Sequence, residues 1–130
     1  MRSILIVDDH KVDHDHIKWI LVKHPEEIDI LSAFSGWEAI ELLTTKLIAS
    51  EKLPDIIFID IVMPEMTGLD FIKKLKTIKK LSTIPTVITS SSTDVSDIIS
   101  SYELKANYYL TKPISTESVE RVVNIIFKKQ

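Results

Sequence analysis

The chain has 130 residues, 45% hydrophobic and 27% charged, which is typical of one globular domain with its own core. A net charge of -3 gives no reason to expect a nucleic-acid partner. The absence of cysteine excludes disulfides, thiolate metal sites and a cysteine nucleophile. The start, MRSILIVDD, has neither a signal peptide nor a membrane span, because Asp8 interrupts the apolar run. We therefore expect one cytoplasmic domain over residues 1–130, with no membrane partner.

Five short runs rich in β-branched and aromatic residues predict strands, at 4–7, 28–31, 56–59, 86–89 and 108–110. Apolar residues at helical spacing predict helices from residue 11 onward and after the sequences GWEAIE, MTG, SSTD and STES. This alternation predicts an α/β fold of five βα units with a parallel sheet. At this size we expect the doubly wound, flavodoxin-like strand order 2-1-3-4-5.

Polar residues follow the predicted strands where each strand ends. Strand one ends in Asp8 and Asp9, strand three in Asp60, strand four in a Thr-Ser pair, and strand five before Lys112. Alone, each of these residues also fits a helix cap, a turn or a solvated loop. In open parallel sheets, however, ligands bind beyond the carboxyl ends of the strands, where the winding reverses between strands one and three. The sequence therefore predicts that these side chains converge on one site.

Three converging carboxylates repel one another and require a cation. Oxygen ligands without cysteine favour Mg2+, which uses one or two carboxylates and keeps positions for water and phosphate oxygens. A carboxylate beside Mg2+ and a lysine can attack phosphorus and form an acyl phosphate. Phosphorylation of Asp60 would add negative charge and demand a new hydrogen-bond donor, for which the Ser90 hydroxyl is available.

The sequence resembles the response-regulator receiver domains of two-component signalling, including the chemotaxis regulators, over essentially its whole length. The matching stretches are ILIVDD at 4–9, SGWEAIELL at 35–43, PDIIFIDIVMPEMTGLDF at 54–71, IPTVITSSS at 84–92 and ANYYLTKP at 106–113. The resemblance implies that Asp60 is the phosphoacceptor and Asp9 a direct metal ligand. It also implies that Asp8 binds the metal through water and that Val62 contributes its backbone carbonyl. The implied cofactor is Mg2+, for which Mn2+ could substitute.

The same resemblance implies a role for three further residues. Lys112 matches the lysine that pairs with the phosphoryl group, joined by a cis peptide to the proline after it. Ser90 matches the hydroxyl switch; the family spacing favours it over Thr89, and the choice between the two stays open. Tyr109 matches the aromatic switch, three residues before the lysine, and Tyr108 is then a core residue.

The function implied is signalling rather than enzymatic turnover. A sensor histidine kinase or a histidine phosphotransfer protein would donate the phosphoryl group, and the surface of helix four, strand five and helix five would then change. Because the sequence ends with the fifth helix, at IIFKKQ, we expect a stand-alone receiver without an output domain. It would act by binding a partner, by forming a homodimer or by relaying phosphate. The stretch SYELKANYYLTKP resembles small receivers that work beside phytochrome-type kinases.

Two other classes share part of the pattern. A dehalogenase-type phosphatase also uses an aspartate nucleophile with Mg2+, but it needs an acid two residues later, where this chain has Val62. A flavodoxin-like flavin binder needs a phosphate loop after strand one, where Asp8 and Asp9 would repel phosphate. A degenerate, non-signalling receiver is disfavoured because all the expected side chains are present.

The stretch DDHKVDHDH at 8–16 continues from the aspartate pair into the first helix. His14 and His16 are expected on nearly opposite sides of that helix, so they cannot share an ion. We expect His16 to be partly buried on an apolar stripe with the residues four positions before and after it. His10 and His14 could form a zinc pair, but two ligands fall short of a structural site. Asp13 and Asp15 are expected to favour the helix N-terminus and to face solvent.

Overall fold

Five strands form one parallel sheet in the order β2-β1-β3-β4-β5, as the sequence predicted, in a computed structural model that describes residues 1–130. The strands are β1 (Arg2–Val7), β2 (Ile28–Ala33), β3 (Ile56–Asp60), β4 (Thr86–Ser90) and β5 (Tyr108–Thr111). The helices are α1 (Lys11–Leu21), α2 (Gly36–Ile48), α3 (Gly68–Lys76), α4 (Val95–Glu103) and α5 (Thr116–Lys128). The expected doubly wound fold is therefore confirmed.

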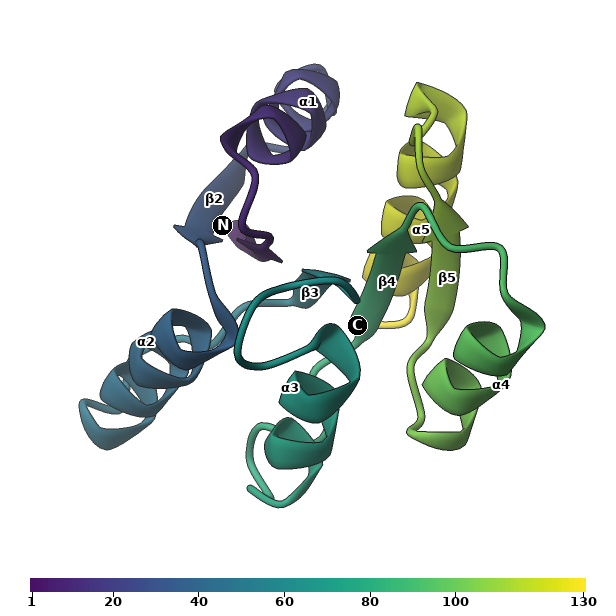
Figure 1. Cartoon of the computed structure of the whole chain (residues 1–130). Helices are drawn as coiled ribbons and strands as arrows, with labels where there is room; N and C mark the ends of the chain where they lie inside the picture. The colour runs from purple at the N-terminus through teal and green to yellow at the C-terminus, as the bar shows by residue number, and fades with distance from the viewer.

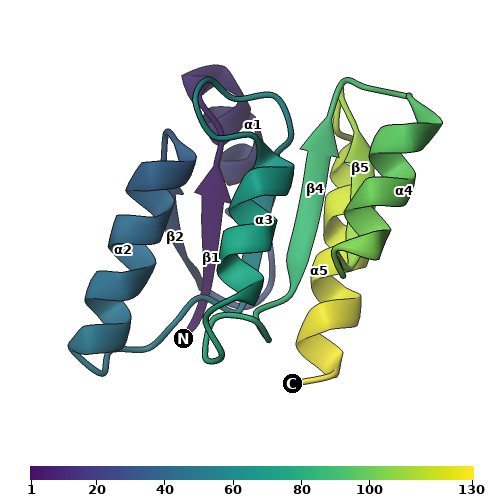
Figure 2. The same cartoon turned by 60° about the horizontal axis from the view of Figure 1, so that its bottom comes forward.

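Helices cover both faces of the sheet. Helices α1 and α5 lie on one face and α2, α3 and α4 on the other, as the two views show (Figure 1, Figure 2). Successive residues of β1 serve the two cores in turn: Leu5 and Val7 pack toward α2 and α3, whereas Ile4 and Ile6 pack toward α1 and α5. The helices on the two faces thus exclude water from the central strands β1 and β3. Polar side chains of these strands can reach solvent only at the strand ends.

The segment between β3 and α3 folds back over the end of β3. A capping box starts α3, in which the Thr67 hydroxyl accepts a hydrogen bond from the backbone N–H of Asp70 and the Asp70 carboxylate accepts one from Thr67. Gly68 donates its N–H to the Ile61 carbonyl at 2.8 Å. A Cβ at residue 68 would lie 2.3 Å from the carbonyl oxygen of Asp60, so no side chain fits there.

Helix α1 spans the expected residues, but the expectation for its buried side is wrong for His16 and Val12. His16 is exposed, and Val12, on the same expected stripe, is 77% exposed. Ile20 of that stripe is buried as expected, at 1% exposure, but beside it lie His14 and Ile17, at 0% and 1% exposure. Apolar residues occur all around this short helix, so their spacing does not determine which side meets the sheet.

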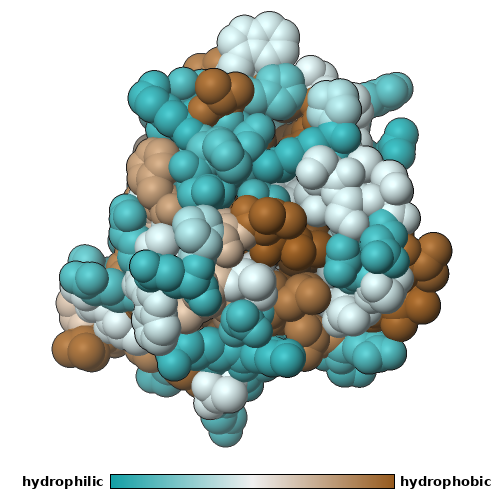
Figure 3. Space-filling model, in the orientation of Figure 1, coloured by the Kyte–Doolittle hydropathy of each residue, from teal (hydrophilic) through white to brown (hydrophobic).

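The surface carries several separated apolar areas. Figure 3 shows the face seen in Figure 1, where hydrophilic residues predominate and hydrophobic ones form islands between them. The exposed large apolar side chains include Trp19 on α1, Trp37 on α2, and Val95 and Ile99 on α4. None of the helices combines the length and the apolar character that crossing a bilayer requires.

Candidate functional site

Three aspartates meet at the carboxyl ends of the two central strands. Asp8 and Asp9 follow β1 and Asp60 ends β3, and these strands are paired neighbours. Asp8 and Asp60 are buried, at 1% and 4% exposure. One oxygen from each aspartate and one ring nitrogen of His10 all lie within 4.8 Å of one another. The structure thus brings together the strand-end carboxylates that the sequence predicted to converge.

Lys112 reaches this cluster from the end of β5. Its Nζ donates hydrogen bonds to Asp8 Oδ2 at 3.0 Å and to Asp13 Oδ2 at 2.9 Å, and lies 3.6 Å from Asp60 Oδ1. The peptide bond between Lys112 and Pro113 is cis. Asp13 was expected to face solvent, but it is a fourth carboxylate of the site. Its position in the first turn of α1, which begins shortly after β1 ends, is the sequence feature that could have indicated this contact.

Burial disfavours the ionised form of Asp60 and raises its pKa to about 6, and the negative charge of the nearby Asp8 adds to this rise. Lys112 opposes this rise but does not cancel it. Burial alone would lower the pKa of Lys112, but its hydrogen bonds with Asp13 and Asp8 outweigh burial and raise that pKa. The site therefore places the charged Lys112 ammonium group beside the Asp60 carboxylate, whose ionised form is disfavoured.

The cluster has the properties of a site for a hard cation. The Oδ1 atom of Asp9 is buried and has no hydrogen-bond partner. Four aspartates face a single lysine, so the donor set lacks positive charge. Oxygen ligands with this excess charge fit Mg2+. A hollow of about 370 Å3 opens beside Asp60 and Lys112 and leaves room for a bound group.

Val62 and the loop that it begins lie beside the Asp60 carboxylate. The side chain of Val62 is 65% exposed, so it does not cover the hollow that it helps to line. Its backbone N–H points to Asp60 Oδ1 at 3.4 Å, which tethers that carboxylate weakly. Asp60 Oδ1 therefore accepts one long hydrogen bond and remains open to other partners.

The histidines of the DDHKVDHDH stretch have separate environments. His14 is fully buried, donates from Nε2 to the Asp8 carbonyl at 2.7 Å and stacks on Phe34 at 4.3 Å between ring centroids. His14 is not among the residues whose ligand atoms gather around His10, so the structure does not support a zinc pair of the two histidines. His16 donates from Nε2 to the Ile114 carbonyl at 2.7 Å, which ties α1 to the loop after Lys112.

Ser90 and Tyr109 are linked through one backbone unit. Ser90 is fully buried at the end of β4, and its Oγ accepts a hydrogen bond from the Ser92 N–H at 3.0 Å. The Tyr109 hydroxyl donates to the Ser92 carbonyl at 2.9 Å. Thr89 is also buried, whereas Tyr108 packs into the opposite core, on the α1 and α5 side. A change at Ser90 therefore has a direct route to Tyr109.

Residues 4–124 match the family model of the response regulator receiver domain. The protein PilH of Pseudomonas aeruginosa is 29% identical over 97% of this chain and 98% of its own length. Histidine kinase P4 of Formosa agariphila is 35% identical over 95% of this chain, which spans only 8% of that kinase.

The fold of this chain also resembles that of a solved response regulator. The phosphorylated cyanobacterial phytochrome response regulator RcpA superimposes with a TM-score of 0.81 and 28% identity, over 96% of this chain and 90% of that one. Sequence, strand order and the aspartate cluster lead to the same assignment. The chain belongs to the response regulator receiver domain family.

Proposed function

We propose that the protein accepts a phosphoryl group on Asp60 from a phosphohistidine donor and thereby changes its binding to a partner. The setting of Asp60 carries this proposal: a buried carboxylate, 3.6 Å from an ammonium group that two other aspartates hold in place. Phosphoryl acceptance is the general function of the family. The donor would be a sensor histidine kinase or a histidine phosphotransfer protein of the cytoplasm.

In the transfer step, a carboxylate oxygen of Asp60 attacks phosphorus. The P–N bond to the donor histidine breaks, and the imidazole leaves with that electron pair and takes up a proton. The nucleophile must be ionised, so its pKa of about 6 makes acceptance favourable near neutral pH. Lys112 Nζ, 3.6 Å from Asp60 Oδ1, would need only a short movement to pair with a phosphoryl oxygen and offset the negative charge of that oxygen.

The residues that would hold Mg2+ are the carboxylates of Asp9 and Asp60 and the backbone carbonyl of Val62, with Asp8 acting through water. The unpartnered Oδ1 of Asp9 supports this assignment. When bound, the ion supplies positive charge to the phosphoryl oxygens, and Mn2+ accepts the same oxygen ligands. Asp9 would thus gain a partner for its buried oxygen.

Phosphorylation replaces one negative charge with nearly two and adds three strong acceptor oxygens. The Ser90 hydroxyl would turn to donate to them and would release the Ser92 N–H, whose hydrogen bond it now accepts. Because the carbonyl of Ser92 accepts from Tyr109, the aromatic side chain would change its position in turn. This shift would favour one of two arrangements of the surface made by α4, β5 and α5. A partner protein, a second copy of the chain or a relay protein would respond to that surface.

The deciding experiment is labelling with acetyl phosphate and Mg2+, followed by a hydroxylamine test for an acyl phosphate. We expect Asp60→Asn to abolish labelling. Asp55→Asn, at the opposite end of β3, is the matched control and should retain it. Labelling that persists in Asp60→Asn would exclude Asp60 as the acceptor.

A further inference from the structure

The side chain of His10 faces the carboxylates of the proposed phosphorylation site. His10 is the N-cap residue of α1, but its side chain makes no capping hydrogen bond. Its Nδ1 lies instead 3.2 Å from Asp9 Oδ1 and 3.4 Å from Asp8 Oδ1. This ring nitrogen has no role in the proposed phosphoryl transfer.

These separations are those expected for ligands of one ion. Two ligands at right angles around an ion, with bonds of about 2.1 Å, lie about 3.0 Å apart. The two distances from His10 Nδ1 are close to this value, and Asp60 also lies within the 4.8 Å limit of the group. The buried Oδ1 of Asp9 has no hydrogen bond to give up on binding. The nitrogen and the carboxylates are therefore already near a coordinating arrangement.

We propose that Nδ1 of His10 is an additional ligand of the metal ion at this site and makes the site favour later transition ions such as Co2+ over Mg2+. The inference rests on the proposed function, which places the ion among Asp8, Asp9 and Asp60. An imidazole nitrogen suits first-row transition ions, whereas Mg2+ prefers oxygen. The side chain of His10 is 65% exposed, so it can exchange with a water ligand without disturbing the core.

The other histidines are differently engaged. His14 and His16 each bond a backbone carbonyl through Nε2. In His24, Nε2 bonds the Asn124 side chain, and Nδ1 accepts from the Glu26 N–H. His24 lies beyond the C-terminal end of α1, away from the aspartate cluster, so His24→Gln is a matched control for His10→Gln.

Pulsed electron paramagnetic resonance of the Mn2+-loaded, unphosphorylated protein tests the ligand directly, because the echo is modulated by a coordinated imidazole nitrogen. We expect this modulation in the wild type and in His24→Gln, and its loss in His10→Gln. Absence of nitrogen modulation in the wild type, or its persistence in His10→Gln, would overturn the proposal.

Titration calorimetry with Co2+ and with Mg2+ tests the selectivity. We expect His10→Gln to weaken Co2+ binding by about tenfold, the lower end of what residues around a metal ion contribute, and Mg2+ binding by less than about twofold. Equal losses for the two ions would refute the selectivity. If labelling of Asp60 persists without nitrogen coordination, this inference fails alone; if coordination is found without labelling, the proposed function fails alone.

Discussion

The two ends of β3 each carry an aspartate in a different setting. Asp55, just before the strand, accepts a hydrogen bond from the Ser3 N–H at 2.8 Å and lies 3.4 Å from Lys52 Nζ. Asp60, at the other end, is more deeply buried, and its nearest cation, that of Lys112, is 3.6 Å away and bonded to other aspartates. The first carboxylate has a short hydrogen bond and its own lysine, whereas the second has one long hydrogen bond and a lysine that is bonded to other aspartates. A weakly partnered carboxylate at a strand end is available for chemistry.

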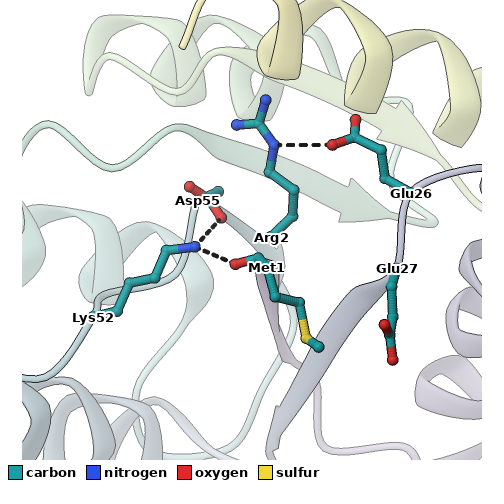
Figure 4. A pocket seen from close by; sticks show the side chains of 6 residues that line it. All are labelled: Met1, Arg2, Glu26, Glu27, Lys52 and Asp55. Carbon is teal, nitrogen blue, oxygen red and sulfur yellow. Dashed lines mark hydrogen bonds and ion pairs between the residues drawn. The ribbon is translucent and has the colours of Figure 1, made fainter.

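The hollow near Asp55 shows why size alone is a poor guide to a site. It has about 680 Å3, against about 370 Å3 beside Asp60. Figure 4 shows four of its five charged side chains in pairs, Arg2 with Glu26 and Lys52 with Asp55; Lys52 also bonds the Met1 carbonyl, and Glu27 has no partner. Paired charges stabilise the fold and leave little attraction for a ligand, whereas the smaller hollow combines burial with unbalanced charge.

The largest contrast between the two ends should appear in phosphorylation rate. We expect Lys112→Ala to slow labelling by acetyl phosphate by roughly a hundredfold, because it removes the cation that would stabilise the phosphoryl charge. Lys52→Ala removes the corresponding cation from the other end and should leave the rate unchanged. Equal rates for Lys112→Ala and the wild type would show that the two ends do not differ in this way.

Replacing Asp60 should raise the stability of the protein, whereas most substitutions of buried residues lower it. A pKa raised from 3.8 to about 6 corresponds to about 3 kcal/mol of unfavourable free energy at neutral pH. Asp60→Asn removes this charge but buries an amide, so we expect a net gain of about 2 kcal/mol in urea unfolding without metal. A loss of stability would contradict the claim that the ionised Asp60 carboxylate destabilises the folded protein.

The pH dependence of that gain follows from the sign of the pKa change. Because the folded protein holds the proton of Asp60 more tightly than the unfolded chain, its unfavourable contribution is absent below about pH 4. The contribution grows as pH rises and is complete above about pH 6. In urea unfolding, the gain of Asp60→Asn over the wild type should therefore be full at pH 7.5 and lost by pH 4. A difference that is constant over this range would argue against titration of Asp60.

Removal of Asp55 should act in the opposite direction. Asp55→Ala leaves the Ser3 N–H without its acceptor, and we expect a loss of about 1 kcal/mol in urea unfolding. Labelling of Asp60 should be unaffected, which separates a structural carboxylate from a reactive one. A gain of stability would show that both ends of β3 carry unfavourable charge.

The smallest effect is expected at the rim of the larger hollow. Glu26 is half-exposed and 3.5 Å from Arg2, so Glu26→Ala should change the free energy of unfolding by only a few tenths of a kcal/mol. Urea unfolding at low and high salt measures this term. A loss above about 1 kcal/mol would mean that this pair does more than a surface ion pair normally does.

The sequence predicted the fold and the strand-end aspartates because both depend on short-range patterns. Alternating strands and helices determine the doubly wound order, and this order brings the ends of β1 and β3 together. The residue pattern alone was therefore enough to place Asp9, Asp60 and Lys112 at one edge of the sheet. Their roles in phosphoryl transfer and metal binding remain proposals.

The parts that were missed depend on the rotation of α1. Rotating a helix by one residue moves each side chain by about 100°, and the apolar residues of α1 fit several rotations. His14 was therefore not recognised as the buried histidine, nor His16 as the exposed one. The same uncertainty concealed the contact of Asp13 with Lys112.

Gly68 has no functional group, yet it lies so close to the backbone of Asp60 that no side chain fits between them. Any side chain there would collide with the carbonyl of Asp60 and with Ile61, and the β3 end would have to move. A mutational scan scored by phosphorylation would thus register position 68 as essential, although it takes part in no chemical step. Intolerance to substitution and participation in the reaction are separate properties, and this position would display the first without the second.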